Sequence, residues 1–134
     1  MIDHVSIGVS DLKKARAFYD VVLLALSYMR VHDVDIPGQG VVAHGYGEAG
    51  AQARFWIGVP EHVNADANRT GGNHFAFQAK SRLEVDAFYQ AAINNGAKDN
   101  GAPGIRAHYH PNYYGAFVFD PDGNKIEACC HLPE

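Results

Sequence analysis

The feature that most constrains the fold is an internal repeat with a spacing of 70 residues. The tripeptide at 17–19 (AFY) returns at 87–89, and His4 returns as His74. Each match falls at the same place in a pattern of one strand followed by one helix, which a chance coincidence does not explain. The chain is therefore predicted to hold two copies of one module, whose half-sheets are related by a pseudo-twofold axis around a central cleft.

The first copy begins with an expected strand at 2–9, which is rich in Ile, Val and small residues. A helix follows, with Ser10 as its N-cap and Asp11 in its first turn, where a carboxylate is favourable. Apolar residues then recur at helical spacing and give this helix one buried face. Three further strands are expected at 25–31, 40–47 and 53–59.

The second copy repeats this order after a polar, small-residue stretch at 60–72 that is typical of a linker. A strand is expected at 73–79, and Ser81 and Glu84 form a capping box that opens a second helix. A short strand at 105–110 and a closing hairpin complete the copy. The predicted fold is α+β, with two tandem βαβββ modules at about 1–62 and 72–134.

The closing hairpin carries the least expected residue of the chain. Strand-forming residues at 116–119 and 125–130 flank the stretch at 120–124 (DPDGN), whose composition favours a tight turn. Glu127 interrupts the second of these otherwise apolar strands. A carboxylate there is costly unless it is paired, exposed on a wet face of the sheet or bound to a metal.

Composition narrows the possible functions. The 134 residues are 47% hydrophobic and 19% charged, as in a globular domain, and a net charge of −4 without a basic cluster argues against nucleic-acid binding. The longest aliphatic run, at 21–26, is too short to span a bilayer, and the first residues do not resemble a signal peptide. Cys129 and Cys130 are adjacent on a strand, so they are expected to be reduced and the protein cytoplasmic.

Two histidines and the hairpin carboxylate suggest a metal site. His4 and His74 occupy equivalent places in the two copies, and Glu127 lies in the last strand of the second. Two imidazoles and one carboxylate suit one divalent ion such as Fe, Mn, Ni or Zn and leave positions open for substrate. The alternative is that each histidine is an ordinary hydrogen-bonded strand residue.

A second polar cluster lies between the second helix and the hairpin. If 106–110 is extended, Arg106, His108 and His110 share one face. His110 or His108 would then be a general acid or base, while Arg106, Tyr113 and Tyr114 orient an oxygen-rich substrate and Tyr114 is a further candidate for proton transfer. The alternative places these groups on a solvated loop or in hydrogen bonds to one another. His32, His62 and His131 are expected to be exposed, and His44 is assigned to the core or surface, with the cleft as the alternative.

The chain resembles the vicinal oxygen chelate superfamily, which includes glyoxalase I, extradiol dioxygenases, fosfomycin-resistance transferases and bleomycin-binding proteins. The resemblance covers essentially the whole length and rests on the segments 2–7 (IDHVSI), 73–77 (NHFAF) and 119–127 (FDPDGNKIE), together with the helix opening at 10–12 and 17–19. It implies metal ligands from the first and fourth strands of each module. These correspond to His4, His74 and Glu127, with a fourth position in the strand at 53–59.

The fourth position departs from the glyoxalase I pattern, which the resemblance implies should carry a second carboxylate. The strand at 53–59 (ARFWIGV) holds none, and Glu61 and His62 lie beyond it. Trp56 is instead expected to line the cleft and touch a ligand. The remaining set of two histidines and one glutamate resembles that of extradiol dioxygenases and fosfomycin-resistance transferases.

These observations favour a small metal-dependent enzyme that chelates the vicinal oxygens of a small-molecule substrate, as a glyoxalase-like lyase or isomerase or as a dioxygenase. The metal-free alternatives are a binding protein of the bleomycin-resistance type and a scaffold that only dimerises, and a fosfomycin-resistance-like transferase is a further enzymatic alternative. The resemblance also implies a homodimer, with no nucleic-acid or membrane partner.

Overall fold

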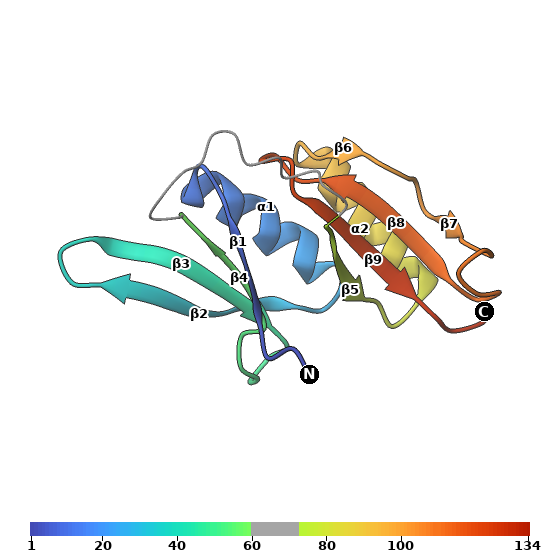
Figure 1. Cartoon of the computed structure of the whole chain (residues 1–134), viewed down its shortest axis with the longest axis horizontal. Coiled ribbons are helices and arrows are strands. Elements are labelled where there is room, and N and C mark those ends of the chain that lie inside the picture. The colour runs from blue at the N-terminus through green and yellow to red at the C-terminus, as the bar shows by residue number, and fades with distance from the viewer. Residues whose placement is uncertain (60–72) are drawn as a thin grey trace. The chain divides into compact units, whose positions relative to one another are not determined.

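The computed structural model describes residues 1–59 and 73–134, so the expected linker at 60–72, with Glu61 and His62, lies outside the described residues. The chain divides into two compact units, Met1–Ala67 (unit 1) and Asn68–Glu134 (unit 2). Each unit holds one helix and one sheet, which confirms the predicted α+β class (Figure 1). The central cleft expected between the two copies stays a prediction.

Unit 1 follows the predicted strand and helix order. Its elements are β1 (Val5–Gly8), α1 (Leu12–Leu24), β2 (Met29–Ile36), β3 (Gly40–Gly47) and β4 (Phe55–Gly58). The sheet order is β1-β4-β3-β2, with β1 parallel to β4 and the other neighbours antiparallel. Helix α1 covers one face of this sheet with a buried stripe of five side chains: Ala15, Phe18, Tyr19, Val22 and Leu23.

Unit 2 has the same order of elements, but two short strands form one edge of its sheet. Its elements are β5 (Phe75–Gln78), α2 (Arg82–Asn94), β6 (Lys98–Asp99), β7 (Gly104–Ile105), β8 (Tyr114–Phe119) and β9 (Lys125–Cys130). The sheet order is β5-β9-β8-β6, and β7 also pairs with β8. Helix α2 packs on β8 and β9 through buried side chains that include Val85, Phe88 and Ala92. The two short strands β6 and β7 replace the long β2 of unit 1.

The structure corrects two details of the first helix. Asp11, not Ser10, is the N-cap of α1, because its Oδ1 accepts a hydrogen bond from the amide of Lys14 at 3.0 Å. The strand expected at 25–31 starts only at Met29, because the chain continues in helical turns through Leu26, which is 1% exposed. Burial of Leu26 therefore extends the helical region into the stretch that the sequence predicted as a strand.

The turn signals of unit 2 are confirmed. The amide of Glu84 donates to Ser81 Oγ at 3.2 Å, so Ser81 is the N-cap of α2, while Glu84 Oε2 accepts from the amide of Lys80 at 2.6 Å, one residue before the cap. Gly96 follows the C-cap with a φ of +96°. Strands β8 and β9 form the expected hairpin, whose turn is held by the buried carboxylate of Asp120 through the amides of Asp122 and Asn124. No helix within the described ranges is long and apolar enough to cross a bilayer.

Candidate functional site

Glu127 is the buried centre of the candidate site in unit 2. Its side chain is 1% exposed, and both carboxylate oxygens have partners. Oε2 lies 3.1 Å from Nε2 of His74, and Oε1 accepts a hydrogen bond of 2.6 Å from the hydroxyl of Tyr113. The alternative of a carboxylate on a wet sheet face is therefore wrong, because a buried carboxylate requires the partners that it has here.

The strand register brings these groups together. Glu127 lies between Ala76 of β5 and Phe117 of β8, on the face of the sheet opposite α2, which we call the open face of unit 2. Gly115 leaves the space that the carboxylate occupies. A Cβ atom at Gly115 would lie 3.0 Å from Oε1 of Glu127 and 3.1 Å from the ring of Tyr113. The glycine is thus a local requirement of the site.

The surroundings of Glu127 keep the phenol of Tyr113 and the thiol of Cys129 protonated. Burial raises the pKa of Tyr113, and the hydrogen bond to Glu127 raises it further. Burial also raises the pKa of Cys129, which carries a free, buried thiol as the sequence predicted. Tyr113 therefore remains a hydrogen-bond donor that fixes the orientation of Glu127 across the neutral pH range.

His110 joins the site through a histidine that sequence reasoning left out. The amide of Asn112 donates to Nδ1 of His110 at 3.1 Å, so His110 donates from Nε2 to Nδ1 of His131 at 2.6 Å. Nε2 of His131 lies 3.8 Å from the sulfur of Cys129, and its ring packs edge-on against Tyr113. His131 is exposed, as predicted, yet it connects His110 to the surroundings of Glu127.

The other candidates of the second cluster lie elsewhere. Residues 106–110 form a turn, in which the amide of Tyr109 donates to the carbonyl of Arg106, so the expected extended strand and shared face are wrong. His108 is exposed and contacts the ring of Tyr109. Tyr114 points to the helix side, where its hydroxyl donates to Asp86 at 2.8 Å, so the structure does not bring it to Glu127. Arg106 stays on the open face, above the ring of Phe117.

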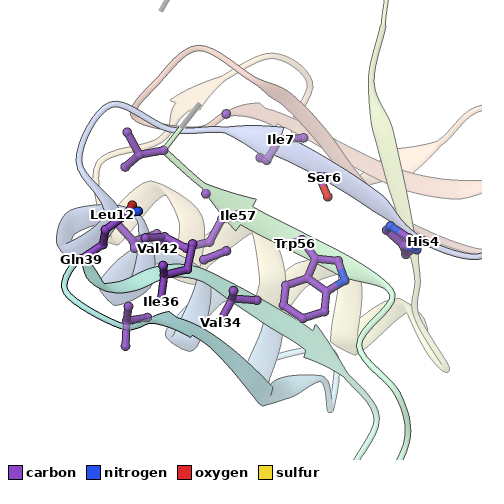
Figure 2. Close-up of a pocket in the computed structure, with 15 residues that line it drawn as sticks. His4, Ser6, Ile7, Leu12, Val34, Ile36, Gln39, Val42, Trp56 and Ile57 are labelled. Carbon is purple, nitrogen blue, oxygen red and sulfur yellow. The ribbon is translucent and has the colours of Figure 1, made fainter. Parts of the chain in front are cut away.

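Unit 1 contains a pocket of a different character. It has a volume of about 790 Å³ and lies on the side of the sheet that carries Ser6 and Trp56, which we call the open face of unit 1. His4 lies at one end and Gln39 at the other, and Trp56 forms part of the wall (Figure 2). The expected contact of Trp56 with a ligand stays a prediction. Most of the remaining lining is apolar or glycine, including Val34, Ile36, Val41, Val42 and Ile57. This volume is in the range of pockets that take small organic ligands.

The register shows which residue of unit 1 stands at the place of Glu127. Ser6 pairs with Trp56, and Ala76, which is 70 positions after Ser6, pairs with Glu127. Trp56 is therefore the repeat equivalent of Glu127. The sequence showed no second carboxylate in this strand. In the structure the indole of Trp56 occupies the equivalent position, and Gly45 leaves room for it.

The residues of unit 2 fit one part of a metal site. An imidazole nitrogen and a carboxylate oxygen, both suitable ligands for divalent first-row metals, lie together at His74 and Glu127. Within 1–59 and 73–134 no group of three or more His, Cys, Asp or Glu side chains is arranged so that it could hold a metal ion. His44, by contrast, is buried and hydrogen-bonded to Asp33 at 2.7 Å on the helix side of unit 1, which agrees with the core assignment.

Comparisons with known proteins agree with this architecture. A protein of the glyoxalase/bleomycin resistance family from Albidiferax ferrireducens T118 is 31% identical, with 96% of this chain and 97% of that chain covered and a TM-score of 0.74. A glyoxalase/bleomycin resistance protein/dioxygenase family enzyme from Burkholderia phytofirmans PsJN is 22% identical over 98% of both chains, with a TM-score of 0.71.

A genomically encoded fosfomycin resistance protein, FosX, from Listeria monocytogenes shares the fold at 18% identity. The match covers 98% of this chain and 93% of that one, with a TM-score of 0.67. No curated protein sequence matches the chain. The sequence model of the superfamily matches residues 1–128, and with the paired strand-and-helix units described above it confirms the resemblance. The chain belongs to the glyoxalase/bleomycin resistance protein/dioxygenase superfamily.

Proposed function

We propose that this protein is a metal-dependent enzyme acting on an oxygen-bearing small molecule, with His4, His74 and Glu127 as the ligands of one divalent ion. The observation that carries the proposal is the buried Glu127 carboxylate, with one oxygen 3.1 Å from His74 and the other held by Tyr113. A buried carboxylate beside a partly exposed imidazole is suited to binding a cation. His4 is the partner from unit 1, as the repeat and the family resemblance imply.

Each residue of unit 2 has a role in this proposal. Tyr113 donates to Oε1 of Glu127 and so orients Oε2 towards His74. His110 and His131, connected by a 2.6 Å hydrogen bond, are placed to accept or return a proton at the edge of the site. The metal, when bound, would supply Lewis acidity that stabilises negative charge on the substrate oxygens.

The reaction type stays open between a glyoxalase-like lyase or isomerase, a dioxygenase and a fosfomycin-resistance-like transferase. Trp56 at the place of a second carboxylate weighs against a glyoxalase that needs two carboxylates. The expected homodimer and the choice among Fe, Mn, Ni and Zn belong to the same proposal.

The test is the metal content of the untagged protein, measured by mass spectrometry beside His74→Ala and Glu127→Ala. Wild type should hold close to one equivalent per chain, and both variants should lose it, because each removes one ligand. His108→Ala is the matched control, since it removes an imidazole from the exposed turn, and it should keep the wild-type content. A wild-type protein that takes up no divalent ion, even when ions are added, contradicts the proposal.

A metal-free binding protein is the second candidate, and the pocket around Trp56 favours it. The chain has one tryptophan, so its fluorescence reports on this pocket alone. Quenching of Trp56 by 2-naphthol that does not change when a chelator is added would support this second function. A quenching that depends on the metal would support the enzyme.

A further inference from the structure

Two cations flank one aromatic ring on the open face of unit 2. The guanidinium carbon of Arg106 lies 5.7 Å from the ring centre of Phe117, and the ammonium nitrogen of Lys125 lies 5.0 Å from it. The ring of His74 is 6.0 Å from the same ring. Phe117 pairs with Glu127 across the β8–β9 ladder, so both cations lie beside the candidate metal ligands.

Arg106 is held in place by backbone rather than by a carboxylate. Its Nη2 donates to the carbonyl of Ala102 at 2.7 Å. Two glycines leave room for the guanidinium: a Cβ atom at Gly104 would lie 3.0 Å from Nη1, and one at Gly101 would lie 3.3 Å from Nη2. The side chain is thereby ordered before any ligand arrives, which lowers the entropy cost of binding.

Neither cation has an acidic partner in the part of the chain that the structure describes. None of the ion pairs there includes Arg106 or Lys125. Glu127, the carboxylate of this face, has both oxygens engaged by His74 and Tyr113. Two like charges around one ring repel each other, and an anion bound between them removes that cost.

We propose that Arg106 and Lys125, the two cations at the ring of Phe117, form a subsite for a carboxylate group of the ligand beside that ring. The planar guanidinium matches the geometry of a carboxylate, and the lysine adds a second charge. The inference rests on the proposed function for its purpose, since a carboxylate held here presents the adjoining part of the molecule to His74 and Glu127. It assigns the substrate class as an oxygen-bearing carboxylic acid.

The test is a titration of chelator-treated protein with benzoate, followed by amide NMR, with benzamide as the neutral probe of the same shape. Benzoate should shift the amide signals of Gly101, Gly104 and Phe117, and benzamide should not. Arg106→Met and Lys125→Met should each weaken benzoate binding about tenfold or more, because each removes a charge-assisted contact. Lys80→Met, which removes an exposed lysine from the same unit, should bind as wild type does.

Equal binding of benzoate and benzamide, or unchanged affinity in both methionine variants, overturns the carboxylate subsite. Because metal is absent from this titration, its result is independent of the metal measurement. Benzoate binding in a protein that never takes up metal would support the carboxylate subsite and contradict the metal-dependent enzyme. Metal binding without benzoate binding would support the metal-dependent enzyme and contradict the subsite.

Discussion

The open faces of the two units have diverged although their backbones repeat. Unit 1 presents Trp56 and aliphatic side chains around a pocket of about 790 Å³, with His4 at its end. Unit 2 presents Glu127, His74 and two cations at the matching strands. Both units therefore have a histidine before their first strand. They differ in the residue on their last strand, which is Trp56 on β4 and Glu127 on β9.

This difference shows that the helix side of each unit maintains the fold while the open side can change function. Phe18 and Phe88 are repeat equivalents, and both are almost fully buried against their own sheets. Trp56 and Glu127 are also equivalents, yet one is an indole in an apolar wall and the other a buried carboxylate.

The largest expected effect tests the conserved side of the comparison. Phe18→Ala and Phe88→Ala should each lower the free energy of unfolding by about 3–5 kcal/mol, because each leaves a cavity under its helix. Urea denaturation followed by circular dichroism measures both. Leu83→Ala is the control, since Leu83 is 77% exposed and should cost less than about 0.5 kcal/mol. A much smaller cost in one phenylalanine variant would contradict the equivalence of the two cores.

The second prediction concerns the indole of unit 1. A Cβ atom at Gly45 would lie 2.8 Å from the ring of Trp56 and 2.6 Å from Cβ of Ala53. Gly45→Ala should therefore destabilise the protein by about 1–3 kcal/mol and shift the emission of Trp56, as overpacking does. Urea denaturation followed by tryptophan fluorescence measures both effects.

Gly58→Ala is the matched control for this prediction, because a Cβ there would lie 3.4 Å from its nearest neighbours. It should change stability by less than about 0.5 kcal/mol. Equal stability of Gly45→Ala and wild type would show that the indole of Trp56 can move without cost. Trp56 would then not be held in place by its neighbours as Glu127 is.

Much of the fold was predictable because local signals and the repeat agree. The capping residues Ser81 and Glu84, the glycine after α2 and the hairpin turn at 120–124 each specify a boundary by short-range chemistry. The first strands and β2 were placed too early, and for β2 the reason is that the helical turns continue to the buried Leu26. Asp11 replaced Ser10 as N-cap because both residues can cap and the choice depends on backbone geometry.

The proximity of His74 and Glu127 agrees with the sequence analysis, while the role of His4, His74 and Glu127 as metal ligands stays a prediction. A carboxylate in an apolar strand is a strong signal, and Glu127 has the paired environment it requires. The period-two interpretation of residues 106–110 failed because the chain turns between Arg106 and Tyr109, which carries His108 away from the other candidates. His131 gave no signal, since a histidine after the last strand is usually an exposed end residue. Its position becomes clear only in the structure, where Nε2 of His131 lies 3.8 Å from the sulfur of Cys129.

The smallest expected effect is a pH dependence that belongs to the buried phenol of unit 1. Tyr46 is 1% exposed, and its hydroxyl donates to Asp20 at 3.0 Å. Burial raises the pKa of Tyr46 above its usual value near 10, and Asp20 raises it further. Above about pH 10 the unfolded chain loses a proton that the folded chain keeps, so stability falls as pH rises.

Tyr46→Phe should remove about 1.2 kcal/mol of this alkaline loss between about pH 9.5 and 11, measured by urea denaturation. Tyr109→Phe, at an exposed phenol, should keep the wild-type slope. The repeat equivalent of Tyr46 in unit 2 is Val118, as the pairings of Phe55 and Ile126 show. An unchanged slope in Tyr46→Phe would contradict the assignment of the alkaline loss to this phenol. A reduced slope would show that the helix side has also diverged, from an apolar contact to a buried phenol that depends on pH.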